Sequence, residues 1–215
     1  MLNNASARKA IAGTIEPPAR LLLRIGVTPD MVTLVGALGS SLTALILVPR
    51  GEFLWAVAIL LVLMVSDLLD GTMARMRGTA GPWGNFLDST LDRVTDAALF
   101  ASLLWWAVLN DDDISAWAAA VTIAAGVAIS YSKARAESLG ANADGGIMER
   151  AERLIVAGVA GLLTGFGVDW AMPVLLSVLA VLSVVTVIQR FMKVRRQLVP
   201  AAGSAGPDAG EDGHS

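Results

Sequence analysis

Six long apolar stretches, joined by short polar segments, limit this chain to few possible folds. Each is long enough to cross the hydrocarbon core of a bilayer as an α-helix, which takes about 20 residues. Across the chain 55% of the residues are hydrophobic and only 16% are charged, unlike a typical soluble domain. Because no stretch alternates apolar and polar residues as a half-buried strand would, we predict an all-α integral membrane protein with six transmembrane helices. The stretches are residues 30–49, 53–76, 85–109, 114–138, 149–167 and 170–196.

The two ends of the chain differ from these stretches. Residues 5–24 place Leu21–Leu23 on one side of a helix, which indicates an amphipathic helix lying in the membrane interface. The tail is rich in Gly, Ala and acidic residues, a composition typical of disorder. We therefore expect a cytoplasmic interfacial segment over 1–29, a six-helix transmembrane domain over 30–199 and a disordered cytoplasmic tail over 200–215.

The first transmembrane stretch has a clear start. Thr28 can cap a helix, Pro29 suits its first position, and Asp30 lies where the positive end of the helix dipole favours an acid. We therefore expect a helix that begins at Pro29.

The basic residues indicate how the chain is oriented. If the N-terminus is cytoplasmic, every Lys and Arg except Arg50 lies within or beside a cytoplasmic helix end, while the acidic run Asp111–Asp113 lies outside. This is the positive-inside pattern of membrane proteins. We predict a multi-pass protein of the cell membrane with both termini and the candidate site on the cytoplasmic side. The Ala-, Val- and Gly-rich composition is compatible with a high-GC bacterium.

The chemistry open to this chain rests on carboxylates. The chain has no cysteine, and its single histidine, His214, lies in the tail. A disulfide framework, a thiolate metal site or a histidine-based triad therefore does not fit the sequence.

Four aspartates lie within the second and third stretches, at depths where a lipid-facing charge is costly. Asp67 and Asp70 are spaced to share one face of a helix, and so are Asp88 and Asp92. Because the link between the two stretches is short, we expect the helices to be antiparallel neighbours. The four carboxylates would then converge near the cytoplasmic surface.

Converging carboxylates repel one another unless cations lie between them. Hard oxygen ligands select ions such as Mg²⁺, Mn²⁺ or Ca²⁺, and two such ions about 3.5–4 Å apart suit a displacement at phosphorus. Gly71 and Ala74 leave room for a ligand to approach the backbone, Arg75 can neutralise a phosphate, and Gly84 helps the chain turn into the third helix. Asp96 continues the stripe of acids, and we expect it to orient neighbouring groups by hydrogen bonding.

These residues match the signature D-x2-D-G-x2-A-R-x8-G-x3-D-x3-D at every fixed position, from Asp67 to Asp92. In this motif and in its layout of six stretches the chain resembles the CDP-alcohol phosphatidyltransferases. The resemblance implies transfer of a phosphatidyl group from CDP-diacylglycerol to an alcohol, with release of CMP, at two divalent cations, Mg²⁺ or Mn²⁺. It also implies a homodimer among membrane lipids, and we expect no nucleic-acid partner.

The resemblance also implies a role for each residue of the motif. Asp67, Asp70 and Asp88 resemble metal ligands, and Asp92 resembles a ligand or, more in keeping with the chemistry, the base that deprotonates the acceptor hydroxyl. The positions similar to those that bind CDP-diacylglycerol are Asp67, Asp70, Gly71, Ala74, Arg75 and Gly84.

Basic residues in the last three stretches lie at about the membrane depth of the aspartates. Intramembrane charges usually face the interior of a bundle, and several cations indicate an anionic acceptor, such as a phosphorylated alcohol. This argues against choline, ethanolamine or free inositol. The candidate acceptor-phosphate residues are Lys133, Arg153 and Arg190, with Arg135 and Arg195 as weaker candidates.

The segments Ser132–Glu137 and Glu149–Arg153, with Gly145 and Gly146 between them, resemble one branch of the family, the phosphatidylinositol phosphate synthases of actinobacteria. This favours inositol 1-phosphate as acceptor. Glycerol 3-phosphate, the acceptor of the phosphatidylglycerophosphate synthases, is the second possibility. A cation-dependent transporter is the alternative outside enzymes, but the inverted repeats and interrupted helices usual in transporters are not evident in this sequence.

Overall fold

The computed structural model describes residues 15–79 and 81–199, and for residues 65–67 it describes the backbone alone. Within these ranges the chain is helical and forms no strand, so the prediction of an all-α protein is confirmed. Each of the six apolar stretches is largely helical, and residues 15–24 are helical as well. The helices are α2 (Pro29–Leu47), the short 3₁₀ helix η1 (Val48–Arg50), α3 (Phe53–Arg77), α4 (Pro82–Leu109), α5 (Asp113–Ser138), α6 (Arg150–Gly165) and α7 (Ala171–Leu198).

Four of the described helices are long and apolar enough to cross a membrane: α2 together with η1, α3, α5 and α7. Helix α4 is long enough, but it carries Asp88, Asp92, Arg93 and Asp96. Helix α6 has only 16 residues and begins with a charged turn. The count of six crossings is therefore not established by length and composition. The expected interfacial helix lies partly, and the expected tail wholly, outside the described residues.

The start of α2 agrees with the local signals in the sequence. The hydroxyl of Thr28 accepts a hydrogen bond from the backbone N–H of Met31 at 3.3 Å, and Pro29 is the first residue of the helix. This satisfies one of the backbone donors that the first turn of a helix leaves free. The prediction of a helix beginning at Pro29 is confirmed.

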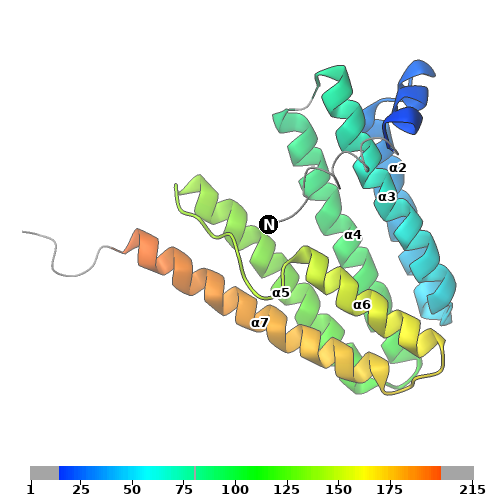
Figure 1. Ribbon diagram of the computed structural model, residues 1–215. Coiled ribbons are helices and arrows are strands. Elements are labelled where there is room, and N and C mark those ends of the chain that lie inside the picture. Colours follow the sequence, from blue (N-terminus) through cyan, green and yellow to red (C-terminus); the bar gives the residue numbers. More distant parts are fainter. Residues whose placement is uncertain (1–14, 80, 200–215) are drawn as a thin grey trace, which may run out of the picture.

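The helices form two groups that are joined mainly by the packing of α4 against α5 (Figure 1). Helix α2 packs against α3 and α4 in one group, and α7 packs against α5 and α6 in the other; α4–α5 and α3–α6 contacts join the two. Among the described residues α3 and α4 make little direct contact. The expectation that these two helices are direct neighbours is therefore wrong: they run in opposite directions from a short link, but α2 packs against both.

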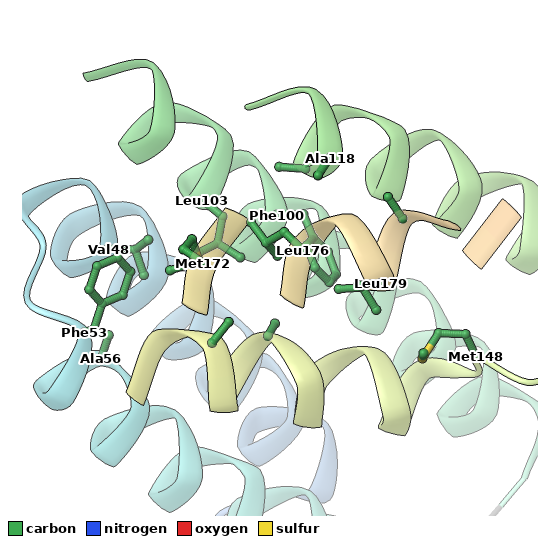
Figure 2. Close-up of a cluster of buried hydrophobic side chains, with 14 residues drawn as sticks. Val48, Phe53, Ala56, Phe100, Leu103, Ala118, Met148, Met172, Leu176 and Leu179 are labelled. Carbon is green, nitrogen blue, oxygen red and sulfur yellow. The ribbon is translucent and has the colours of Figure 1, made fainter. Parts of the chain in front are cut away.

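The apolar core lies at the end of the molecule where α2 connects to α3 and α6 connects to α7 (Figure 2). Phe53 and Trp106 meet edge to face there, with ring centroids 5.1 Å apart. Helix α6 approaches α3 closely, since a Cβ added at Gly165 would lie 2.9 Å from a Leu54 side-chain carbon. Firm packing at this end leaves the opposite ends of α3, α4 and α5 for polar residues. Of the largest fully buried apolar side chains, Met172, Leu176 and Leu179 lie in this core, and Met73 lies toward the other end of α3.

Residues 139–149 form the α5–α6 loop, which is held against α7 by polar side chains. The Gln197 amide accepts from the N–H of Asn142 at 2.9 Å and donates to its carbonyl at 2.7 Å. Further along, the hydroxyl of Thr186 accepts from the N–H of Met148 at 2.9 Å. The loop passes so close to α7 at Gly146, where φ is +142°, that a Cβ would lie 2.4 Å from a Thr186 carbon. The loop therefore has a defined conformation without secondary structure of its own.

Candidate metal and substrate site

A cavity of about 800 Å³ opens between α2, α3, α4 and α6. Most of its wall is apolar, formed by residues such as Leu60, Met64 and Leu162. The charged part of its lining comes from the middle of α4, with Asp88, Asp92 and Asp96, and from the start of α6, with Glu149, Arg150 and Glu152. A cavity of this kind suits a ligand that joins an apolar portion to a charged group.

Asp70 lies on α3 with its carboxylate turned toward α2. It is 9% exposed, and its Oδ2 accepts a hydrogen bond from the hydroxyl of Thr33 at 2.5 Å. The Thr33 hydroxyl also lies 3.1 Å from the carbonyl of Pro29, so it is fixed between its own helix and the aspartate. Thr33 also lines the cavity. This contact could not be predicted from the sequence, because a threonine in the second turn of a helix is ordinary.

Asp88 links the two parts of the motif electrostatically. Its carboxylate interacts with those of both Asp70 and Asp92, so acids from α3 and α4 face a common region. Among the described residues no Lys or Arg lies within salt-bridge distance of Asp70 or Asp88. Two acids that repel each other without a basic partner, and that offer only oxygen ligands, fit a hard divalent cation.

The structure does not assemble a complete set of metal ligands. Among the side chains that it describes, no three Asp, Glu or His residues come close enough together to hold an ion. The side chain of Asp67, the first aspartate of the motif, is outside that set. Asp70, Asp88 and Asp92 are the motif aspartates whose side chains the structure describes.

Asp92 and Asp96 are paired with arginines of α6. Arg150 bridges them: its Nη2 lies 2.9 Å from Asp92 Oδ1, and its Nε donates to Asp96 Oδ1 at 3.1 Å. Arg153 donates from Nη2 to Asp96 Oδ2 at 2.8 Å, while its Nε and Nη1 are buried and have no hydrogen-bond partner among the described residues. Arg150 was not among the residues that the sequence singled out, although its place at the start of α6 brings it into the cavity lining.

Four other motif residues lie outside the described lining of the cavity. Arg75 is exposed and donates to the hydroxyl of Thr72 at 3.1 Å. A Cβ at Gly71 would lie 3.6 Å from the Arg75 guanidinium, and one at Gly84 would meet nothing within 4 Å. Ala74 is half-buried on the last turns of α3. Open space therefore lies beside Gly84, whereas the Arg75 side chain lies against Gly71.

The five candidate acceptor cations do not gather at one point, and none lies in the described cavity lining. Arg153 faces Asp96 on α4. Arg190 is buried; it donates to the carbonyls of Ile129 at 2.9 Å and Gly145 at 3.2 Å and pairs with Glu149 at 3.3 Å. Arg135, which donates to the Ser138 hydroxyl at 3.3 Å, and Arg195 are exposed.

Lys133 pairs with the α5–α6 loop instead. Its Nζ lies 2.5 Å from Asp144 Oδ1. The hydrogen bond and charge of this ammonium hold the pKa of Asp144 below its usual range. Lys133 and Arg190 thus both contact the loop, one through Asp144 and the other through the Gly145 carbonyl.

The fold and the site describe a helical membrane protein whose apolar cavity carries a cluster of carboxylates. A family model for the CDP-alcohol phosphatidyltransferases matches residues 26–189. The chain belongs to this family, and it is therefore a transferase.

The relatives agree closely over most of the chain. The phosphatidylinositol phosphate synthase of Streptomyces avermitilis is 42% identical over 217 residues, which cover 97% of this chain and 89% of the relative. That of Corynebacterium glutamicum is 44% identical and covers 86% of this chain and 85% of its own. Crystal structures of the Mycobacterium tuberculosis phosphatidylinositol phosphate synthase, one with CDP-DAG bound and one with manganese and citrate, each match with a TM-score of 0.80 at 38% identity. They cover 90% of this chain and 97% and 92% of their own, respectively.

The Asp96–Arg153 pair yields a stability prediction. In Asp96→Asn the 2%-exposed Arg153 loses its charged partner, and breaking such a buried pair typically costs about 3–5 kcal/mol. We expect a clearly lower apparent melting temperature in detergent with chelator present. Asp169→Asn, the same change at an exposed loop residue, is the control and should leave the melting temperature unchanged. Equal melting temperatures for Asp96→Asn and the wild type would show that Arg153 does not depend on this acid.

Proposed function

We propose that the protein transfers the phosphatidyl group of CDP-diacylglycerol to inositol 1-phosphate, forming phosphatidylinositol phosphate and CMP. The observation that carries the proposal is the complete aspartate motif on α3 and α4, in a chain more than 40% identical to phosphatidylinositol phosphate synthases over most of its length. The cavity supports it, because its apolar wall suits acyl chains and its acidic part suits a metal-bound diphosphate.

The motif residues then divide the chemistry between them. Asp67, Asp70, Asp88 and Asp92 would hold two divalent cations, Mg²⁺ or Mn²⁺, which neutralise charge on the diphosphate. Thr33 would fix the orientation of Asp70. Gly71, Ala74, Arg75 and Gly84 would bind the cytidine diphosphate at the open side of the motif.

Asp92 would act as the base. An acceptor hydroxyl transfers its proton to this carboxylate as the oxygen attacks the phosphorus that bears diacylglycerol. The new O–P bond forms as the bond to the CMP oxygen breaks, and CMP leaves. Asp92 lines the cavity, as this role requires.

Basic side chains would recognise the acceptor's phosphate. Lys133, Arg153 and Arg190 are the first candidates, with Arg135 and Arg195 as weaker ones. Charge-assisted hydrogen bonds from several cations would favour a phosphorylated acceptor over a neutral alcohol. Arg153 and Arg190 already form ion pairs with Asp96 and Glu149. Binding of the acceptor's phosphate would therefore require each arginine to leave its acid or to contact the acid and the phosphate together.

We further propose that α4 and α6 also cross the membrane, giving six crossings in a bacterial cell membrane with both termini and the site cytoplasmic. Helix α4 has 28 residues, and its acids face the cavity and α6 instead of lipid. An N-terminal interfacial segment over 1–29, a catalytic domain over 30–199, a tail over 200–215 and a homodimer complete the proposal.

Turnover with different acceptors tests the function. Purified protein is incubated with CDP-diacylglycerol, Mg²⁺ and either inositol 1-phosphate, glycerol 3-phosphate or free inositol, and lipid products are identified by mass spectrometry. We expect phosphatidylinositol phosphate and CMP with the first acceptor alone. Product from glycerol 3-phosphate only would keep the reaction class but refute the acceptor, and no CMP release with any acceptor would refute the enzyme.

Cysteine labelling tests the topology, and the chain has no cysteine of its own to interfere. Asn142→Cys should be protected from a membrane-impermeant maleimide in intact cells, because its loop is expected to be cytoplasmic. Asp112→Cys should react, since the α4–α5 turn is expected to lie outside. Labelling of position 142 in intact cells would overturn the orientation.

A further inference from the structure

The α5–α6 loop provides the close acidic partner of Lys133, although α5 itself carries an acid within reach of this lysine. Lys133 has an acid one helical turn away, Glu137, but that contact is long, at 3.9 Å. The close partner, at 2.5 Å, is Asp144 on the loop. The preference of Lys133 for Asp144 over Glu137 therefore depends on the conformation in which the loop is held.

Asp144 is fixed from three sides. Its backbone N–H donates to the Asn142 side chain at 2.7 Å, and the same side chain donates back to Asp144 Oδ2 at 3.2 Å. Its carbonyl accepts from Lys193 on α7 at 2.6 Å. With the backbone held by α7 and one oxygen held by Asn142, the other oxygen is aimed at Lys133.

The pair is also open to competition from solution. The side chains of Lys133 and Asp144 are 42% and 57% exposed, so a dissolved anion can reach the ammonium. The acids that pair with the two buried arginines are tied more firmly: Asp96 also binds Arg150, and Glu149 also accepts from the Gly145 N–H at 3.1 Å. Of these three cations, Lys133 has the partner that an incoming anion can displace with least disruption.

We propose that Asp144 is an internal competitor for the acceptor's phosphate, which must displace this carboxylate from Lys133 in order to bind. The inference rests on the proposed function, in which Lys133 binds that phosphate. A phosphate monoester carries about 1.5–2 negative charges against one on the carboxylate, so it can displace Asp144 from Lys133. A neutral alcohol cannot. The loop thus weakens phosphate binding somewhat and keeps Lys133 occupied when no phosphorylated acceptor is present.

Asp144→Asn tests the inference, because a competitor and a positioning residue would change phosphate affinity in opposite directions when removed. Asparagine keeps the shape of the side chain and leaves the backbone bonds to Asn142 and Lys193 in place, but it removes the competing charge. Because exposed ion pairs are weak, we expect the dissociation constant for inorganic phosphate and the KM for inositol 1-phosphate to fall by about two- to five-fold. The KM for CDP-diacylglycerol should not change. Lys133→Ala should have the opposite effect on phosphate and acceptor.

Asp111→Asn is the matched control. Asp111 is exposed, lies beyond the opposite end of α5 and has a φ of +54°, a conformation that asparagine tolerates. All three variants are assayed as full-length protein in lipid nanodiscs, with phosphate binding measured by calorimetry and folding checked by melting temperature.

Two outcomes would overturn the inference. If folded Asp144→Asn binds phosphate more weakly, as Lys133→Ala does, the aspartate positions the lysine and does not compete. If phosphate affinity is unchanged, the pair has no bearing on anion binding. The binding of inorganic phosphate is measured without turnover. A wild-type protein that binds phosphate but does not use inositol 1-phosphate as a substrate would therefore refute the proposed acceptor, while the competition between phosphate and Asp144 at Lys133 could still be measured.

Discussion

The structure depends on how carboxylates are accommodated in a largely apolar bundle. Helix α4 has the length of a membrane span but carries three acids along one stripe, and each needs a compensating partner. Arg150 and Arg153 supply it for Asp92 and Asp96, which ties α6 to α4. Asp88 repels its neighbours without a basic partner among the described side chains. The same constraint that ties α6 to α4 therefore leaves Asp88 as the acid of this stripe for which we propose a metal cation as partner.

The division of the bundle into two groups serves this arrangement. Apolar side chains pack firmly near Phe53, Leu103 and Leu176, and α2 packs against both α3 and α4, which make little direct contact among the described residues. The cavity lies beside α2. Its apolar wall, which suits acyl chains, adjoins the aspartates of α4 that line the same cavity. A direct α3–α4 contact would bring the acids together without this space. The hydrogen bond from Thr33 fixes the Asp70 carboxylate against α2.

Local chemistry made the helices predictable, and long-range packing limited the prediction of the site. Apolar length and the Thr28–Pro29 cap determine where α2 begins, and both can be read from neighbouring residues. The depth of Lys133 and Arg190 could be counted along their helices, but their partners could not, because residues of the α5–α6 loop and, for Arg190, also of α5 supply them. Arg150 was missed for a similar reason: a basic residue at a cytoplasmic helix end looks like a topology signal until α4 brings Asp92 beside it.

The central claim is that carboxylates of α3 and α4 hold a pair of divalent cations for phosphatidyl transfer. Electron paramagnetic resonance of Mn²⁺ bound to the full-length protein in nanodiscs with CDP-diacylglycerol tests it most directly. Two Mn²⁺ ions about 3.5–4 Å apart should bind per chain and give a spin-coupled spectrum. Because the Asp88 carboxylate interacts with those of Asp70 on α3 and Asp92 on α4, Asp88→Asn should abolish the coupling between the two ions. A spectrum of isolated Mn²⁺ in the wild type, or no bound Mn²⁺, would contradict the account.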